Sequence, residues 1–272
     1  MKDRLYTNIL RGIRKKIRGQ ENLYKRINWN WFDLRIIKNM PEDRENIVKL
    51  FDRRIHVFGR IGFIHAVREI FLEELYKIEL NLNPFIIDCG ANIGLSVIYF
   101  KRRFPNSTII AFEPDEVNFE LLKKNISIFN FTGITLEKKA VWKENTTLSF
   151  SNEGTMMSKI VDAGTYRVEA IKLKDLINKS IDLLKIDIEG AEYEVLVSIR
   201  EDLYQVKNLF IEYHGSFSQN FELNKIFKIL TEAGFSYYIK EAAPVYLHPF
   251  IRKKPEHVPY DIQLNIFCFR TA

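Results

Sequence analysis

A glycine-containing turn after an apolar segment is the part of this chain best suited to bind a ligand. Residues 85–87 are apolar, Asp88 follows them, Gly90 and Gly94 bracket the turn, and a helix is expected from Leu95. This order is typical of a buried parallel strand that leads into a helix N-terminus. Glycine has no Cβ, so the backbone of such a turn can approach a ligand closely.

The glycine spacing argues against a dinucleotide. A dinucleotide fingerprint has glycines at its first, third and sixth positions, so that the pyrophosphate meets the helix N-terminus. Counted from Gly90, the third and sixth positions are Asn92 and Leu95. S-adenosylmethionine (SAM) lacks phosphate and carries an ammonium, a carboxylate and a sulfonium; Asp88 could attract the ammonium, directly or through water, and turn N–H groups could hold the carboxylate. The alternative is a plain strand-to-helix turn without a ligand.

A second acid follows the next expected strand. Glu113 lies about 20 residues beyond the turn, where an acid commonly meets a ribose diol. The alternative is that Glu113 only favours the start of the next helix, although Pro114 and Asp115 already serve that purpose. An acid at this position suits NAD and SAM equally. Only the glycine spacing therefore distinguishes between these two cofactors.

A third group of charged residues follows the expected fourth strand. Lys185 and Asp187 lie on the same side of that strand, because strand side chains alternate. A carboxylate here could act as a general base, bind a divalent metal or hold substrate hydroxyls. Glu189 and Glu192 could do the same, or could simply favour the N-terminus of the following helix.

Glu212 and His214 end the expected fifth strand. Histidine has a reference pKa of about 6.5 and could take a proton from an alcohol; the alternative is an ordinary loop or capping histidine. Asp187, Glu212 and His214 could together hold a divalent metal, which remains an open possibility. His248, in a loop rich in Pro and Tyr, could line an acceptor site.

Three sequence blocks together resemble one family. They are Asp88–Gly94, Phe112–Pro114 and Leu184–Glu192, in that order along the chain. They are similar to blocks of the FkbM family of SAM-dependent methyltransferases, and the resemblance covers roughly residues 70–270. It implies a class I methyltransferase fold: a doubly wound, mostly parallel, seven-stranded sheet with helices on both faces. It also implies, most often, O-methylation of a hydroxyl on a sugar, glycan or polyketide-derived acceptor.

The periodicity of the chain agrees with an α/β fold. Strand and helix patterns alternate from residue 85, which indicates a doubly wound sheet. Helical faces recur over 119–129, 191–199 and 223–230. The last strand is apolar enough to be inserted in the sheet. Strands are expected near 85–88, 109–113, 133–137, 182–187, 207–213 and 263–269, with two further strand-like pieces at 147–150 and 167–171.

Ligands of open α/β sheets bind beyond the carboxyl ends of the strands. Ala140 and Val141 follow the third strand, where the adenine of SAM is expected; ordinary core packing is the alternative. The predicted catalytic residues are Asp187, Glu189 and His214. The predicted cofactor-binding residues are Asp88, Gly90, Asn92, Gly94, Glu113, Ala140 and Val141.

The chain is expected to comprise an N-terminal extension, residues 1–80, and a methyltransferase domain, residues 81–272. A short strand near 55–58 and a helix over 64–80 are expected in the extension. Residues 1–26 read as a basic amphipathic helix, which could attach to an anionic membrane. Packing against the chain's own domain or a second subunit is favoured. RNA binding is the least favoured alternative, because no nucleic-acid module accompanies the charge.

Composition sets the remaining bounds. The chain has 272 residues, 46% of them hydrophobic, and a net charge of +6, which suits one large α/β domain with an extension. Its two cysteines, in strand-like apolar runs, indicate a reducing compartment. No N-terminal apolar run resembles a signal peptide. A cytoplasmic location is expected, with contact at the inner membrane face as an alternative.

The first hypothesis is a SAM-dependent O-methyltransferase in which an acceptor oxygen displaces the sulfonium methyl by an SN2 reaction. An NAD-dependent oxidoreductase and a non-catalytic partner-binding subunit are the alternatives. The acceptor-binding segments carry no motif that identifies the acceptor.

Overall fold

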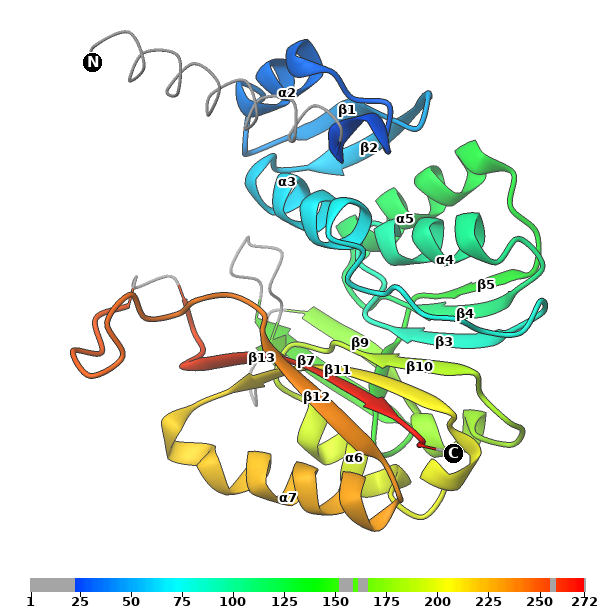
Figure 1. The fold of residues 1–272 in the computed structure, drawn as a ribbon, viewed down its shortest axis with the longest axis vertical. Coiled ribbons are helices and arrows are strands. Elements are labelled where there is room, and N and C mark those ends of the chain that lie inside the picture. The colour runs from blue at the N-terminus through cyan, green and yellow to red at the C-terminus, as the bar shows by residue number, and fades with distance from the viewer. Residues whose placement is uncertain (1–22, 152–158, 161–165, 255–257, 272) are drawn as a thin grey trace, which may run out of the picture. The chain divides into compact units, whose positions relative to one another are not determined.

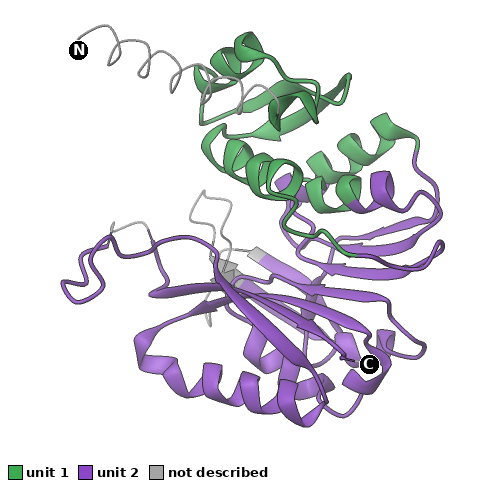
Figure 2. Cartoon of the chain, in the orientation of Figure 1, with its two compact units in different colours: residues 1–78, 93–99, 120–130 green, residues 79–92, 100–119, 131–272 purple. Residues whose placement is uncertain are grey.

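The structure is a computed structural model in which the chain divides into two compact units (Figure 2). The first contains residues up to 78 with 93–99 and 120–130, and the second contains 79–92, 100–119 and the residues from 131 onward. The predicted boundary near residue 80 stays a prediction. The structure describes residues 23–151, 159–160, 166–254 and 258–271, and at 150, 151, 159, 160 and 166 it describes the backbone alone.

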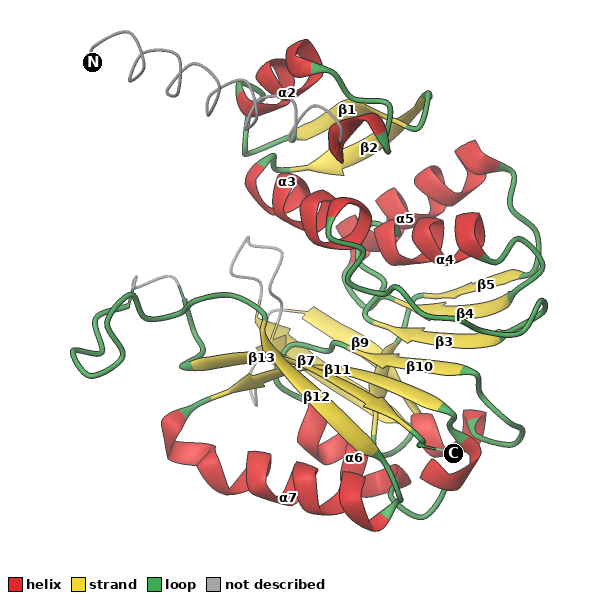
Figure 3. Ribbon diagram, in the orientation of Figure 1, coloured by secondary structure: helices red, strands yellow, loops and turns green. Residues whose placement is uncertain are grey.

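Among the described residues, a seven-stranded sheet forms the centre of the second unit (Figures 1 and 3). The strand order is β12-β13-β11-β10-β3-β4-β5. The pairs from β11 to β5 are parallel, whereas β13 is antiparallel to both neighbours. The predicted sheet and its inserted late strand are therefore confirmed. The strands are β3 (Phe85–Cys89), β4 (Thr108–Phe112), β5 (Ile134–Glu137), β10 (Leu183–Ile186), β11 (Asn208–Gly215), β12 (Ser236–Glu241) and β13 (Ile262–Phe269).

The central strands are apolar because they are covered on both faces. Every residue of β3 and of β10 is buried. Two charged residues interrupt this pattern, Asp88 on β3 and Lys185 on β10, and they are register partners. The charged pair lies beneath the expected ligand site.

Helices α6 (Glu192–Ile199) and α7 (Asn220–Glu232) lie on one face of this sheet (Figure 3). Both helices present the apolar face that their periodicity predicts. The core that they share with the sheet includes Val195, Leu196, Ile199, Ile226, Leu230, Ile211 and Ile266. Both cysteines, Cys89 and Cys268, are buried and free.

A smaller sheet with the order β6-β9-β7-β8 lies between β5 and β10 in sequence. The two predicted strand-like pieces fall on β7 and β9, and Ala140 and Val141 are strand residues of β6. The strands are β6 (Ala140–Trp142), β7 (Thr146–Ser151), β8 (Lys159–Ile160) and β9 (Tyr166–Lys172).

The first unit contains a hairpin held by an asparagine of helix α5 (Glu116–Phe129). Asn125 receives the His56 amide at 2.7 Å and donates to the carbonyls of His56 (2.8 Å) and Ile93 (2.9 Å). The predicted strand at 55–58 is confirmed as part of β2, with β1 as its unpredicted partner. The elements are α2 (Trp31–Lys38), β1 (Glu45–Leu50), β2 (Arg53–Phe58), α3 (Ile61–Val67) and the π-helical η1 (Arg68–Leu72).

The helix predicted over 64–80 is wrong beyond residue 72. After η1 the chain reaches Glu74 with a φ of 53°, which ends helical geometry. The predicted basic helix over 1–26 lies, up to residue 22, outside the described residues.

Helices α4 (Leu95–Arg103) and α5 (Glu116–Phe129) begin where the sequence predicts them. Gly94, directly before α4, has a φ of 93°, and a Cβ there would lie 2.7 Å from Leu122 Cδ1. Gly94 therefore permits close packing against α5. In the described part of the chain, no helix combines the length and apolar character needed to cross a bilayer. Short 3-10 helices cover η2 (Leu173–Leu176), η3 (Leu203–Gln205) and η4 (Phe217–Gln219).

Candidate active site

The glycine turn after β3 packs directly against the loop after β10. Gly90 has a φ of 95°, and a Cβ on it would lie only 1.8 Å from the Asp187 carbonyl oxygen. The amides of Gly90 and Ala91 both donate to the Phe112 carbonyl, at 3.0 and 2.8 Å. The turn is thus fixed on both sides by backbone, and no larger residue fits at position 90.

Glu113 holds the turn from the neighbouring strand. Its two carboxylate oxygens accept from the Asn92 amide at 2.8 Å and from the Asp115 amide at 2.9 Å. Burial raises the pKa of Glu113 to about 8, although these two hydrogen bonds oppose the rise. Asn92 has a φ of 48°, a conformation that asparagine tolerates well. The Glu113 side chain is therefore buried and fixed in orientation, and its predicted contact with a ribose stays a prediction.

Asp88 lies under the turn and pairs with a lysine. Lys185 Nζ is 3.0 Å from Asp88 Oδ1, 3.3 Å from Asp187 Oδ2 and 2.7 Å from the Gly90 carbonyl oxygen. Asp88 is 0% exposed and Lys185 only 2%. This ammonium ties β3, β10 and the turn together, and the predicted contact of Asp88 with the cofactor stays a prediction.

A first cavity opens above these residues. The predicted residues Asp88 and Gly94 are not among those that line it. Its lining includes the predicted residues Gly90, Asn92, Glu113, Ala140, Val141, Asp187 and Glu189, together with Phe112, Pro114, Asp115, Asn118, Lys139, Ile188 and Ala191.

A second cavity of about 300 Å³ adjoins the first. Both cavities are lined by Glu189 and Ala191, so these two residues form a shared wall. His248, predicted as a possible acceptor contact, lines neither cavity. The remaining lining of the second cavity is Trp142, Gly190, His214, Gly215, Ser216, Gln219, Pro259 and Tyr260.

Three carboxylates surround the buried His214. Its Nε2 lies 3.7 Å from Glu189 and 3.6 Å from Glu212, and its Nδ1 lies 3.3 Å from Glu192. Burial alone lowers the pKa of His214, but Glu189, Glu192 and Glu212 outweigh it and raise the pKa to about 10. The imidazole therefore holds its proton at neutral pH, and the predicted catalytic role of His214 stays a prediction.

Glu192 has a structural part in this arrangement. Its side chain is buried at the start of α6 and accepts from the Gly190 amide at 2.9 Å and the Ile188 amide at 3.2 Å. Its expected preference for a helix start is thus combined with an ion pair to His214.

Glu189 stands in a strained position on the shared wall. Its φ of 56° lies in the left-handed region, which glutamate rarely adopts. The Tyr260 hydroxyl donates to the Glu189 carbonyl at 2.9 Å and lies 3.2 Å from its carboxylate. Burial raises the pKa of Glu189. The pKa of Glu212 is raised to about 8, mainly by burial and secondly by the negative charge of Asp187. The site therefore holds carboxylates that are more basic than usual.

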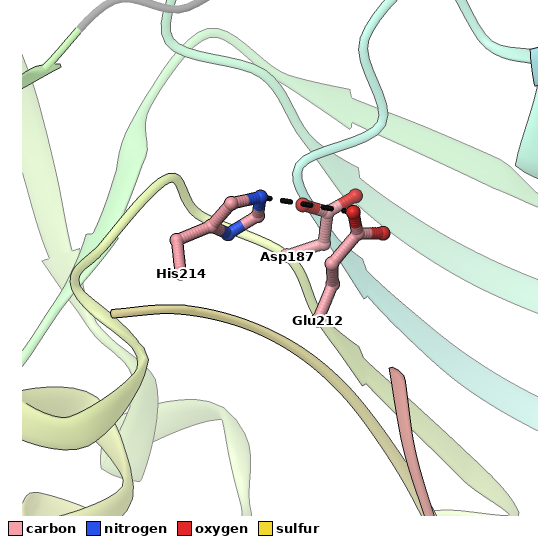
Figure 4. A group of neighbouring side chains, drawn as sticks. All are labelled: Asp187, Glu212 and His214. Atoms are coloured by element: carbon pink, nitrogen blue, oxygen red, sulfur yellow. Dashed lines mark ion pairs between the residues drawn. The ribbon is translucent and has the colours of Figure 1, made fainter. Parts of the chain in front are cut away.

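Asp187, Glu212 and His214 are also arranged as metal ligands. One ligand atom from each lies within 4.8 Å of the other two (Figure 4). Carboxylate oxygen and imidazole nitrogen suit first-row divalent metals. Glu192 engages Nδ1 of His214, so that Nε2 faces the other two residues, as the outer shell of a metal site commonly requires. The residues present fit a divalent metal.

Tyr260 contacts two of the predicted catalytic residues, yet it was not singled out from the sequence. Its ring lies 4.7 Å from that of His214, and its partner Glu189 is 71 residues away in the chain. No local spacing signals such a contact.

Comparison with known proteins agrees with this geometry. A family model described as the methyltransferase FkbM domain matches residues 88–237. The chain belongs to the FkbM methyltransferase family. The match begins at Asp88 and includes β10 and β11, so it covers both cavities except for the segments that contribute Pro259 and Tyr260.

Individual relatives support the assignment. Methyltransferase sdnD of Sordaria araneosa is 30% identical over 220 residues, covering 65% of this chain and 83% of that protein. The 31-O-demethyl-FK506 methyltransferase FkbM of Streptomyces tacrolimicus is 26% identical over 199 residues, covering 57% and 75%. The solved methyltransferase FkbM of Methylobacillus flagellatus KT has a TM-score of 0.51 at 16% identity, covering 75% of this chain and 48% of that one, which supports the fold.

The predicted family, fold and enzyme class are therefore confirmed: this FkbM family member is a SAM-dependent methyltransferase. The alternative of an NAD-dependent oxidoreductase is set aside by the same findings.

Proposed function

We propose that this FkbM family enzyme transfers the methyl group of SAM to a hydroxyl of an acceptor bound in the second cavity. The observation that carries the proposal is the pair of cavities with Glu189 and Ala191 as their shared wall. Methyl transfer needs donor and acceptor to meet in line at short distance. Two adjoining cavities with one common wall suit that requirement.

The first cavity is the proposed SAM site. Glu113 offers a fixed carboxylate to the ribose hydroxyls, and Ala140 with Val141 offers an apolar wall to the adenine. The turn from Gly90 to Asn92 offers backbone groups to the methionyl end. SAM carries positive charge at its sulfonium and ammonium, and the carboxylates of Asp187 and Glu189 line the same cavity, so the charges are complementary.

The second cavity is the proposed acceptor site. Its lining combines Trp142 and Tyr260 with the polar side chains of Ser216, Gln219 and His214. Aromatic faces beside hydrogen-bonding groups suit a sugar ring or an oxygenated polyketide. The relative named 31-O-demethyl-FK506 methyltransferase supports an oxygen acceptor. We therefore keep a sugar, glycan or polyketide-type hydroxyl as the proposed acceptor class.

In the proposed reaction the acceptor oxygen attacks the methyl carbon as the carbon–sulfur bond breaks. S-adenosylhomocysteine leaves with the bonding electron pair, and the acceptor proton passes to a carboxylate of the cluster. Glu189 is the best placed, because it lines both cavities and burial raises its pKa, which strengthens it as a base. Asp187 would help to orient the partners, and protonated His214 would balance the carboxylates around it.

A divalent metal is a further part of this proposal. Asp187, Glu212 and His214 would hold it once His214 has given up its Nε2 proton, and when bound it would lower the pKa of a coordinated hydroxyl and orient a vicinal diol. Methyl transfer assayed with and without a chelator, followed by Mg²⁺, Mn²⁺ or Zn²⁺ addition, tests this part. Turnover that stays unchanged after a chelator has made the protein metal-free would remove the metal from the proposal.

The proposed cofactor site is tested by calorimetry with SAM and S-adenosylhomocysteine. Wild type should bind both, and Glu113→Ala should lose up to roughly tenfold in affinity, since a hydrogen bond contributes about 0.5–1.5 kcal/mol. Glu137→Ala, a half-buried acid at the end of the next strand, is the control. A folded protein that binds neither molecule would contradict the proposal. Incubation with cell extracts and mass detection of a methylated product then identifies the acceptor.

A further inference from the structure

The loop between β12 and β13 exposes three large apolar side chains at its tip. Leu247 is 85% exposed, Ile251 61% and Phe250 103%, so nothing in the described chain packs on the Phe250 ring. Figure 1 shows this orange loop extending away from the end of β12 before the chain returns as β13. Single exposed apolar residues are ordinary, but three within five positions form a patch that suggests a binding surface.

The base of this loop is fixed. Asp261 accepts hydrogen bonds from the Tyr246 hydroxyl and from Lys254 Nζ, the latter at 2.8 Å, and Lys254 also donates to the Tyr260 carbonyl at 3.0 Å. These hydrogen bonds, from Lys254 first and then Tyr246, lower the pKa of Asp261 to about 2. The Tyr246 ring stacks on Phe217 with centroids 5.7 Å apart.

The tip itself is a short turn. The amides of Ile251 and Arg252 donate to the His248 carbonyl at 2.9 and 3.2 Å. Hydrogen bonds therefore fix both the base and the tip of the loop, and in this conformation the apolar side chains of the tip point outward. Their exposure is therefore a property of the folded loop and does not follow from missing contacts at its base.

Positive charge accompanies the apolar tip. Arg252 and Lys253 are exposed directly beside Ile251, and residues 242–254 contain neither aspartate nor glutamate. Apolar side chains that enter the acyl boundary, next to Lys and Arg that meet anionic headgroups, are the combination by which proteins bind lipid interfaces. The net charge of +6 adds long-range attraction to an anionic surface.

We propose that this loop docks the protein on an anionic lipid bilayer. Leu247, Phe250 and Ile251 enter the interface, and Arg252 and Lys253 contact the headgroups. The root of the same loop contributes Pro259 and Tyr260 to the second cavity, so docking brings one wall of that cavity to the membrane. The proposal rests on exposure and charge and holds independently of methyl transfer.

Co-sedimentation of the 272-residue chain with lipid vesicles tests the proposal. One set of vesicles contains phosphatidylcholine alone, and the other contains phosphatidylcholine mixed with phosphatidylglycerol. Binding is expected to the mixed vesicles and to weaken with salt. Phe250→Ser should lower the partition coefficient about tenfold, because the ring supplies much of the inserted apolar area. Lys253→Glu should also lower it about tenfold, by removing one attraction and adding one repulsion.

Matched controls lie elsewhere in the second unit. Leu82, 86% exposed, matches Leu247, so Leu82→Ser should leave binding unchanged where Leu247→Ser weakens it. Lys228, with 73% of its side chain exposed, matches Lys253, so Lys228→Glu should have less effect than Lys253→Glu. Circular dichroism and SAM binding of each variant exclude unfolding as the cause.

Three results would overturn the proposal. The first is that wild type fails to bind the mixed vesicles. The second is that a variant with both Phe250 and Lys253 replaced binds as well as wild type, which would assign binding to another segment. Gel filtration could instead show that Phe250→Ser abolishes self-association of a protein without vesicle affinity, which would make the tip an interface between copies.

Discussion

The two cavities of the second unit are built by different means. The first rests on backbone packing: the Gly90 turn touches the Asp187 carbonyl, and Glu113 fixes the turn through two amides. The second rests on charge, because His214 lies among three carboxylates. The cofactor of a methyltransferase is constant while acceptors vary. If the two cavities are the proposed donor and acceptor sites, this difference would let the acceptor site change without disturbing the packed donor site.

The packing of the first cavity is tested most severely at Gly90. Gly90→Ala should destabilise the protein by at least about 5 kcal/mol and abolish SAM binding, because its Cβ would overlap a backbone carbonyl at 1.8 Å. Urea unfolding and calorimetry measure both effects. Gly190→Ala is the matched control: its φ is also positive, at 100°, but its nearest neighbour atom is 3.5 Å away, so strain alone should cost about 1–2 kcal/mol. Similar losses of stability in the two variants would show that close packing is not the reason why glycine is required at position 90.

The buried charge beneath the first cavity is tested at Lys185. Lys185→Met should lower the free energy of unfolding by about 3–5 kcal/mol, since it leaves the fully buried Asp88 without its cation. Adding Asp88→Asn should restore part of that loss. Lys207→Met is the control, because Lys207 pairs with Asp182 from a half-exposed position and should cost under about 1 kcal/mol. Equal losses in the two lysine variants would show that burial of the pair does not matter.

The shared wall is tested at Glu189. Glu189→Gln should reduce turnover about a hundredfold and leave SAM affinity within a few-fold, since a general base contributes about 10²–10⁴ to rate. Stopped methyl-transfer assays and calorimetry separate the two quantities. The exposed Glu194, paired with Lys143 at 2.8 Å, provides the control Glu194→Gln. A loss of SAM affinity equal to the loss of turnover would make Glu189 part of the donor site alone.

The charge balance of the second cavity predicts a pH dependence. The folded pKa of His214 is raised to about 10 from its reference 6.5, so its contribution to stability is complete below pH 6.5 and is lost as the pH rises to 10. Glu113, raised to about 8 in the first cavity, contributes in the same direction but only between pH 4.5 and 8. Above pH 8 the buried thiols of Cys89 and Cys268, whose pKa values burial raises, contribute in the same direction, so the share of His214 is the difference between wild type and a His214→Gln variant.

Urea unfolding at pH 8 and pH 10 measures this smallest effect. Wild type should lose stability on the order of 2 kcal/mol over that interval, and His214→Gln should lose clearly less. Parallel losses in the two proteins would show that His214 does not hold the proton that its three carboxylates imply.

The first cavity was largely predictable because its signals are local. Gly90, Asn92 and Glu113 lie within 24 consecutive residues, and they follow the carboxyl ends of two neighbouring parallel strands, where ligands of such sheets bind. The same local patterns gave the six core strands. Strand β12 was missed because its Tyr237, Tyr238 and Ile239 are partly exposed at the sheet edge, where no buried period marks a strand.

The second cavity was predictable only in part. Asp187, Glu189 and His214 were expected at the rim, but the pKa of His214 depends on Glu192 and Glu212, whose distance from it is set by tertiary packing. Tyr260 reaches Glu189 across 71 residues. Asp88 was expected to face the ligand, yet its side chain is 0% exposed and pairs with Lys185. This pairing depends on the register between strands β3 and β10, which no local sequence pattern gives.

The antiparallel strand β13 has a consequence for synthesis of the protein. Strand β11 is paired with β10 only from Leu209 to Ile211, and in the described sheet its end, Glu212 to Gly215, is paired with β13 alone. The strands that carry the proposed donor site, β3, β4 and β10, are complete in the sequence by residue 186. The segment with His214 pairs with residues 262–265, so the proposed acceptor site depends on a part of the chain that is made much later.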